Sequence, residues 1–239
     1  MIFYLFALIV LSPFILFALQ FIIGKFKYDK TEYALQTKSS FSSVRFDKGK
    51  YGEYLTYDRL KKLDGHKKFL FNCYIPKGNN ETTEIDLIMI HSTGIYVFES
   101  KNYSGWIFGS ESQKNWTQTL PNGNKVRKER FFNPIIQNKG HIKWLKNYLS
   151  NEVDSIYHSI IVFSERCTLK KIELQTDACK VVKRENVIST IKTIIENTST
   201  VLSDTQIDFT FQKLFPLTQK TEVEKMQHIE NIKNNYNIL

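Results

Sequence analysis

The residues of this chain best suited to chemistry are Glu99, Ser100 and Lys101, which close an apolar run over residues 95–98. A second apolar run over residues 85–90 precedes it and carries Asp86 near its start. If the two runs are paired β-strands, Glu99 and Lys101 point to one face, because side chains two residues apart on a strand share a face. Two carboxylates and a lysine can hold a divalent metal, position a water and stabilise charge on a phosphodiester. The combination predicts a metal-dependent nuclease.

The Glu-x-Lys pattern alone has low specificity. About one instance is expected by chance in a chain of this size. The alternative is a solvated strand end with a surface ion pair, which contributes little stability. The context favours metal binding, because charged residues end a strongly apolar strand and Asp86 lies on the preceding one. Mg²⁺ or Mn²⁺ would find hard oxygen ligands in Asp86, Glu99 and the backbone carbonyl of Ser100.

The surrounding pattern predicts the elements that position these residues. Helical spacing predicts a first helix from Gly52 to Leu63. Strands are expected at residues 69–75, 84–90, 95–102 and 105–109, the last continuing the same meander after a bend at Gly105. Residues 113–130 are expected to form a hairpin or loop, and Asn133-Pro134 is expected to open a helix that runs to about Leu149. Strands are expected near residues 159–163 and 180–182, and helices at 189–195 and 222–236. This order predicts an α/β fold with helices packed on a mixed sheet.

The first 24 residues contain no charged side chain and are long enough to cross a bilayer as a helix. A cleavable signal peptide and a buried core helix are the alternatives. Lys25, Lys27 and Lys30 follow the apolar stretch, so the positive-inside rule places the remaining chain in the cytoplasm. The pattern predicts a single-pass anchor in the cell membrane over residues 1–24 and a polar linker over residues 25–43.

The 239 residues carry a formal net charge of +9, and the pI is about 9.3. Such a basic chain suits a polyanionic partner, although the charge could instead attract anionic lipid beside the anchor. The basic run over residues 125–130 could contact phosphates or form a solvated loop. The three cysteines and five histidines show no zinc-ligand spacing, and neither a nucleophile elbow nor a glycine-rich phosphate loop occurs.

Several motifs together resemble the nuclease-related domain (NERD) family of the PD-(D/E)xK superfamily. They are Gly52-Glu53, Ile85-Asp86, the run over residues 94–102, Gly105, and residues 133–137. The resemblance covers about residues 46–195. It implies a restriction-endonuclease-like α/β core, with a mixed central sheet flanked by helices, and Mg²⁺-dependent phosphodiester cleavage. Members with an N-terminal membrane segment also occur in this family.

The resemblance assigns roles to individual residues. Glu53 would complete the metal shell from the first helix, Asp86 would be the central ligand and Glu99 the second ligand. Lys101 would orient the attacking water or stabilise charge, and Gln137 would bond to Lys101 or to the nucleic acid. The superfamily's proline before the aspartate is absent here, but that position faces away from the site.

The sequence thus predicts a membrane-anchored, metal-dependent nuclease acting more readily on DNA than on RNA. Its nuclease-like domain is expected over residues 44–200, with a helical extension over residues 201–239. One alternative is a nuclease fold that binds nucleic acid without cleaving it. Another is a membrane-tethered interaction or sensor protein. The acids favour the first interpretation, because a pure binder gains nothing from three carboxylates beside a phosphate.

Overall fold

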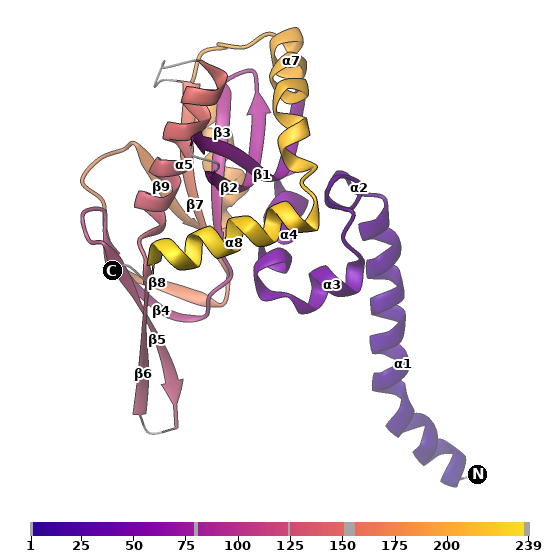
Figure 1. The fold of residues 1–239 in the computed structure, drawn as a ribbon. Helices are drawn as coiled ribbons and strands as arrows, with labels where there is room; N and C mark the ends of the chain where they lie inside the picture. Colours follow the sequence, from indigo (N-terminus) through magenta and orange to yellow (C-terminus); the bar gives the residue numbers. More distant parts are fainter. Residues whose placement is uncertain (1, 79–80, 124, 151–155, 237–239) are drawn as a thin grey trace.

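The computed structural model describes residues 2–78, 81–123, 125–150 and 156–236 (Figure 1). Met1 and residues 237–239, the outer ends of the expected anchor and extension, lie outside the described residues. The described chain has a mixed α/β architecture with two mixed sheets flanked by helices.

The helices and strands follow one another along the chain with few long connections. In order they are α1 (Ile2–Asp29), α2 (Glu32–Thr37), α3 (Phe41–Phe46), α4 (Lys48–Leu60), β1 (Lys67–Gly78), β2 (Glu81–His91), β3 (Gly94–Lys101), β4 (Gly105–Ser110), β5 (Asn115–Asn122), β6 (Lys125–Phe132), α5 (Pro134–Leu149), β7 (Tyr157–Phe163), β8 (Cys167–Glu173), β9 (Cys179–Lys183), η2 (Arg184–Asn186), α6 (Val187–Glu196), α7 (Asp204–Leu214), η3 (Phe215–Thr218) and α8 (Glu222–Tyr236).

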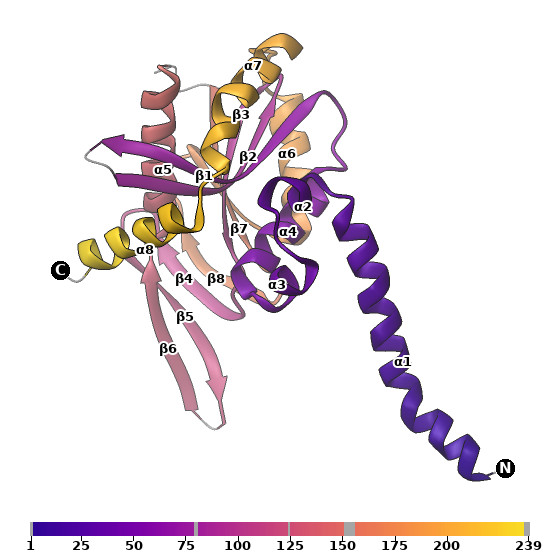
Figure 2. The ribbon, with the colours of Figure 1, turned by 45° about the vertical axis from the view of Figure 1, so that its right-hand side comes forward.

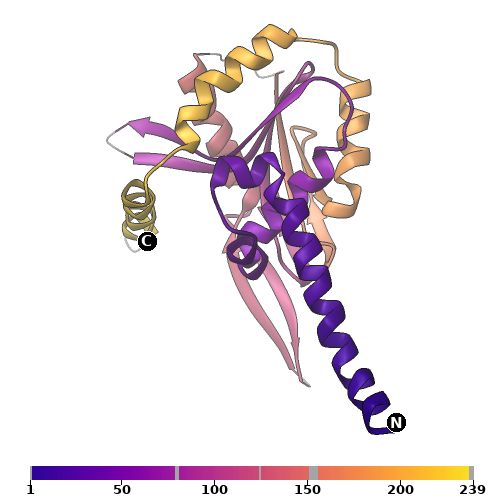
Figure 3. The ribbon, with the colours of Figure 1, turned by 90° about the vertical axis from the view of Figure 1, so that its right-hand side faces the viewer.

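The first sheet has the strand order β1-β2-β3-β7-β9. Strands β1 to β3 are antiparallel neighbours, whereas β3, β7 and β9 run parallel. Helices α4 and α6 pack on one face of this sheet, and α5 and α7 pack on the other (Figure 3). Strand β3 therefore lies in the middle of the sheet, and both faces of its carboxyl end adjoin helices.

The second sheet has the order β6-β5-β4-β8. The prediction that β4 continues the meander of β3 is therefore wrong. Gly105 turns the chain at a φ of 74°, where a Cβ atom would lie 2.2 Å from the carbonyl oxygen of Thr119. Strand β4 then pairs with β5 and β8. The basic run lies on β6, in a hairpin that projects from the body of the molecule (Figure 1).

The β1–β2 pair bends sharply (Figure 2), and the register puts Asn72 opposite Asp86 within it. Asn72 has a φ of 50°. Phe71 still pairs with Leu87, and Cys73 with Ile85, but no ladder pair joins Asn72 to Asp86. The Phe71 side of the bend packs toward α4, whereas the Cys73 side belongs to the cluster containing α5 and α7. The bend interrupts the normal alternation of faces and sets Asp86 at the break.

Residues 25–43, expected to form a polar linker, hold short helices that pack on the body of the protein. Helices α2 and α3 lie within this segment, and α1 extends to Asp29. Tyr28, Tyr33 and Phe41 are buried in the core cluster that also contains α4. The apolar residues of this segment show no clear helical period in the sequence, because the short helices α2 and α3 are stabilised by tertiary packing.

Helix α1 includes a stretch, Leu11–Asp29, long and apolar enough to cross a membrane. It is the single such helix among the described residues, and it lies near the N-terminus. Its final turns contact α3: the Phe21 and Phe41 rings are 5.0 Å apart. Membrane insertion itself stays a prediction, because core helices and signal sequences meet the same criterion.

Candidate active site

Glu99 lies at the end of β3 and is 1% exposed. Its Oε1 atom is 2.6 Å from the Nζ atom of Lys101, and its Oε2 atom is 3.2 Å from the Nε2 atom of His141. Burial favours the neutral form of Glu99, but the charges of Lys101 and His141 outweigh it, so the pKa is lowered. Glu99 is therefore held as a buried carboxylate, with Lys101 at one oxygen and His141 at the other.

Helix α5 supplies two side chains to this site and is fixed against β3. Asn133 caps the helix by accepting a hydrogen bond from the Ile135 amide at 2.9 Å. Asn138, fully buried, donates to the Val97 carbonyl of β3 at 2.9 Å. This register brings Gln137 within 3.2 Å of the Lys101 Nζ atom, which donates to the amide oxygen. His141 lies one turn further along the same face.

Asp86 approaches the site from β2. The β2–β3 ladder ends at Leu87 and Phe98, and the next acceptor is the side chain of Asp86. Its Oδ2 atom accepts a hydrogen bond from the Ser100 amide at 3.2 Å. The carboxylate thus takes the place of a ladder carbonyl where the strands separate. Asp86 and Glu99 face each other across this end of the hairpin.

Glu53 comes from α4, which approaches β3 closely at Gly52. A Cβ atom at Gly52 would lie 2.7 Å from the Cβ atom of Asn102, so a glycine is required for this approach. Glu53 accepts a hydrogen bond from the Tyr33 hydroxyl at 3.3 Å. Helix α4 therefore brings Glu53, the third carboxylate, to the end of β3.

The carboxylates crowd one another. Burial raises the pKa of Glu53 to about 7, and the charges of Glu84 and Glu99 add to this. Burial also raises the pKa of Asp86, again with the charges of Glu99 and Glu53. The pKa of Lys101 is raised because Glu99 and Asp86 outweigh its burial. One lysine and one histidine face four acids, so the site has an excess of negative charge.

This donor set fits a hard divalent cation chemically. Carboxylate oxygens are the ligands that Mg²⁺ and Mn²⁺ prefer, and a cation would relieve the repulsion that raises the pKa values of Glu53 and Asp86. Among the described residues, however, no three acidic, histidine or cysteine side chains stand in a preformed metal-binding arrangement. The Ser100 amide is occupied by Asp86, and whether the Ser100 carbonyl acts as a ligand stays a prediction.

The structure brings Glu53, Asp86, Glu99, Lys101 and Gln137 together at one strand end. Two further side chains at the site, His141 and Glu84, are not predicted from the sequence. His141 has no zinc-ligand spacing, and the signal for it is its position four residues after Gln137 on one helix. Glu84 accepts hydrogen bonds from Asn72 at 3.1 Å and from Tyr74 at 2.8 Å. The roles of the site residues in catalysis or metal binding stay predictions.

A polar groove of about 680 Å³ includes Glu84, one of these acids, in its wall. Asn72 and Glu84 border it at the bend of β1–β2, and its walls come from α2–α3 and the start of α8. Lysine side chains and hydroxyl groups line the groove, namely Lys38, Lys50, Lys220, Lys225, Thr37, Ser39, Ser40, Ser43 and Thr221. In Figure 3, α8 stands apart from α3 and α4.

Residues 48–164 match the family model of the nuclease-related domain, NERD, which confirms the resemblance. An uncharacterized protein of Bacillus anthracis is 38% identical to this chain over 130 residues, covering 54% of the chain and 58% of the relative. The chain thus spans less than two thirds of that relative's length. No solved structure matches the chain.

Proposed function

We propose, with the match to the nuclease-related domain as premise, that this protein is a metal-dependent nuclease. Its substrate would be DNA in preference to RNA, and its core would be restriction-endonuclease-like. One observation carries the proposal: buried Glu99 contacts Lys101 at 2.6 Å, while Asp86 reaches the same strand end from β2. A carboxylate pair with an adjacent ammonium group suits phosphodiester hydrolysis better than simple binding of a polyanion.

Glu53, Asp86 and Glu99 would hold Mg²⁺ or Mn²⁺. The bound metal would polarise the scissile phosphate and lower the pKa of a coordinated water. Lys101 would hold a water or a phosphate oxygen with its ammonium group, which stays protonated because its pKa is raised. Gln137 would orient that ammonium group, and His141 would orient Glu99 from its buried side.

The groove between α2–α3 and α8 would admit the nucleic acid. Its lysines and hydroxyl groups offer phosphate contacts without reading sequence. Lys38 and Lys50 form no ion pair in the described part of the chain, so both can contact a phosphate. The helix α1 would anchor the domain in the cell membrane with the catalytic domain in the cytoplasm.

Cleavage by the full chain in a neutral detergent tests the proposal. The full chain is needed because a fragment starting at Ser43 would lack the buried side chains of Tyr28, Tyr33 and Phe41. Plasmid, linear and single-stranded DNA and an RNA oligonucleotide are incubated with Mg²⁺ or Mn²⁺. We expect cleavage that a chelator stops and that Lys101→Ala slows about 10³-fold, the scale for loss of one charge-stabilising group.

Lys192→Ala is the matched control, since Lys192 is exposed on α6 and outside the site. It should retain wild-type cleavage. Equal rates in wild type and Lys101→Ala, or cleavage that persists in chelator, would exclude this site as the source of activity. Nucleic-acid binding without turnover in every metal tested would favour the silent binding fold instead.

A further inference from the structure

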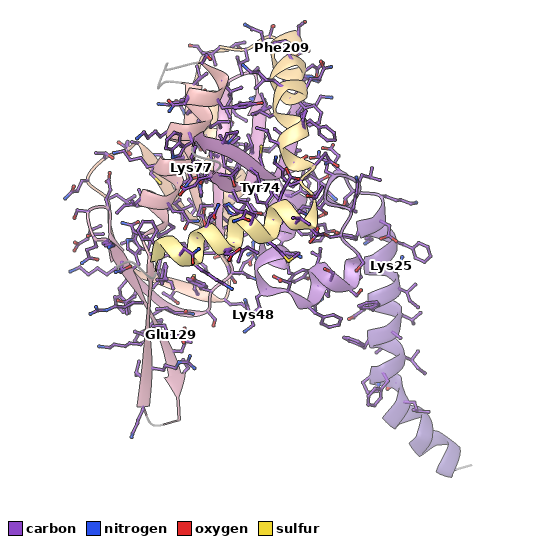
Figure 4. All side chains as sticks on the ribbon, in the orientation of Figure 1. Lys25, Lys48, Tyr74, Lys77, Glu129 and Phe209 are labelled. Carbon is purple, nitrogen blue, oxygen red and sulfur yellow. The ribbon has the colours of Figure 1, made fainter. Side chains whose placement is uncertain are left out.

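A second cavity, of about 310 Å³, opens on the other side of α4 from the carboxylates. Its walls come from α3, the start of α4 and the chain after three strands. Lys48, at the start of α4, lies well away from Tyr74, which lines the polar groove (Figure 4). The two hollows are therefore distinct.

The placement of this cavity follows from the sheet. Asn102, Ser164 and Arg184 line it, and they are the residues directly after β3, β7 and β9. These three strands are parallel neighbours, so their carboxyl ends meet at one edge. In open α/β sheets the carboxyl edge of parallel strands is the usual place for a ligand.

The cavity is basic, and its central cation is buried. Arg184 is 1% exposed and donates to Glu165 at 2.8 Å, to Thr56 at 3.3 Å and to Asn102 at 3.3 Å. These contacts fix its guanidinium group. Arg45, Lys48 and Arg166 add three more cations to the lining, against two carboxylates, Asp47 and Glu165.

The three outer cations are free to bind an anion. Within the described residues none of them forms an ion pair. Arg45 stacks on the Tyr51 ring with its guanidinium carbon 4.6 Å from the ring centre. Arg166 donates to the Asn102 carbonyl at 2.8 Å and to the Ser164 hydroxyl at 3.3 Å, which leaves other N–H groups of its guanidinium for a ligand. Ser164, fully buried, adds a hydroxyl group to the lining.

We propose that this cavity binds a phosphate group of the polynucleotide, which is cleaved at the carboxylate site. Arginine guanidinium groups match phosphate oxygens in geometry and charge. Two lining residues of the cavity lie close to the carboxylate site in the sequence: Asn102 directly follows Lys101 at the end of β3, and Tyr51 lies two positions before Glu53 on α4. Consecutive Cα atoms are about 3.8 Å apart, so a polynucleotide strand that crosses the end of β3 can reach both the cavity and the carboxylate site. This inference rests on the proposed function.

Binding of oligonucleotides to the full chain in neutral detergent, with chelator present to stop turnover, tests the cavity. The variant Lys48→Ala/Arg166→Ala removes two lining cations. The matched control, Lys62→Ala/Lys192→Ala, removes the same charge from exposed positions remote from the cavity. We expect about tenfold weaker binding for the cavity variant and a salt dependence shallower by about one phosphate contact or more. Lys48→Arg should retain wild-type affinity.

The oligonucleotides are used with and without a 5′-phosphate. A defect confined to the phosphorylated form would identify a terminal phosphate as the ligand, and an equal defect in both forms an internal one. Inorganic phosphate should compete with binding more strongly than chloride at equal ionic strength, and the cavity variant should lose this difference. Equal affinities of the cavity and control variants, with melting temperatures unchanged, would overturn the inference while leaving the nuclease proposal intact. Conversely, if Lys101→Ala loses cleavage but keeps wild-type binding, the carboxylate site is needed for cleavage and the cavity binds the oligonucleotide independently of it.

Discussion

The two faces at the end of β3 carry opposite charge arrangements. On one face a buried acid, Glu99, has Lys101 and His141 as partners but stands among further acids. On the other face a buried base, Arg184, has Glu165 as partner but stands among further bases. Burial and the neighbouring Arg59 and Arg166 lower the pKa of Arg184, although Glu165 opposes this. The first face has an excess of negative charge and the second an excess of positive charge, so the two suit ligands of opposite sign.

The sharpest test of the basic face is Glu165→Gln. It removes the charge that compensates buried Arg184 and also the partner of Arg59 at 2.9 Å. Breaking a buried ion pair from one side costs about 3 kcal/mol. We expect the free energy of unfolding to fall by that amount in denaturant titration, and inorganic phosphate to restore part of it. If phosphate and chloride restore the free energy of unfolding of Glu165→Gln equally, the basic face does not bind phosphate specifically.

Gly52→Ala should affect both sites together, because Gly52 packs against Asn102 of the basic cavity and directly precedes Glu53 of the acidic site. The added Cβ atom would meet Asn102 at 2.7 Å and force the helix away from β3. Overpacking of this kind costs about 2 kcal/mol. We expect lower thermal stability and weaker oligonucleotide binding, with slower cleavage because Glu53 moves. Gly140→Ala is a matched control, since nothing lies within 4 Å of a Cβ atom there; if it is equally destabilising, the close approach is not the cause.

The smallest effect is expected from pH at the acidic face. The pKa of Glu53 is near 4.5 in the unfolded chain and about 7 in the fold. The folded state therefore binds the proton more tightly, and stability is lost as pH rises between these values. The loss should be about 1 kcal/mol after allowance for solvent screening. Glu53→Gln should remove this component of the pH profile.

Bound Mg²⁺, like Glu53→Gln, should reduce the loss of stability that accompanies rising pH. Thermal unfolding at pH 5 and pH 8, in chelator and in Mg²⁺, measures the change. We expect Mg²⁺ to stabilise wild type at pH 8 and to have less effect on Glu53→Gln. A wild-type profile that is unchanged by Mg²⁺ would count against Glu53 as a ligand.

Part of this arrangement could be predicted from the sequence. Apolar runs with charged ends located β2 and β3, and their hairpin spacing placed Asp86 beside Glu99. The Asn133-Pro134 pair located the start of α5, and the resemblance to the nuclease-related domain put Gln137 beside Lys101. These inferences succeed because period, turn residues and caps are local properties of the chain.

The rest depended on contacts between distant segments. The basic cavity gathers Asn102, Ser164 and Arg184 only because three strands are parallel, and no spacing in the sequence records that pairing. Asn138 fixes α5 through a carbonyl 41 residues earlier. The division into two sheets depends on the direction of the chain after Gly105. Such features are set by tertiary packing, which local pattern does not encode.

The packing of α1 to α3 onto the body determines how far the domain can travel. A flexible chain over residues 25–43 would allow a root-mean-square excursion of about 24 Å. Here Tyr28, Tyr33 and Phe41 are buried, so residues 25–43 are packed and give no flexible connection between α1 and the rest of the protein. If α1 crosses a bilayer, the domain samples a thin layer at the membrane surface. The local concentration of the domain is then high for polynucleotide in that layer, and polynucleotide farther from the membrane is beyond its reach.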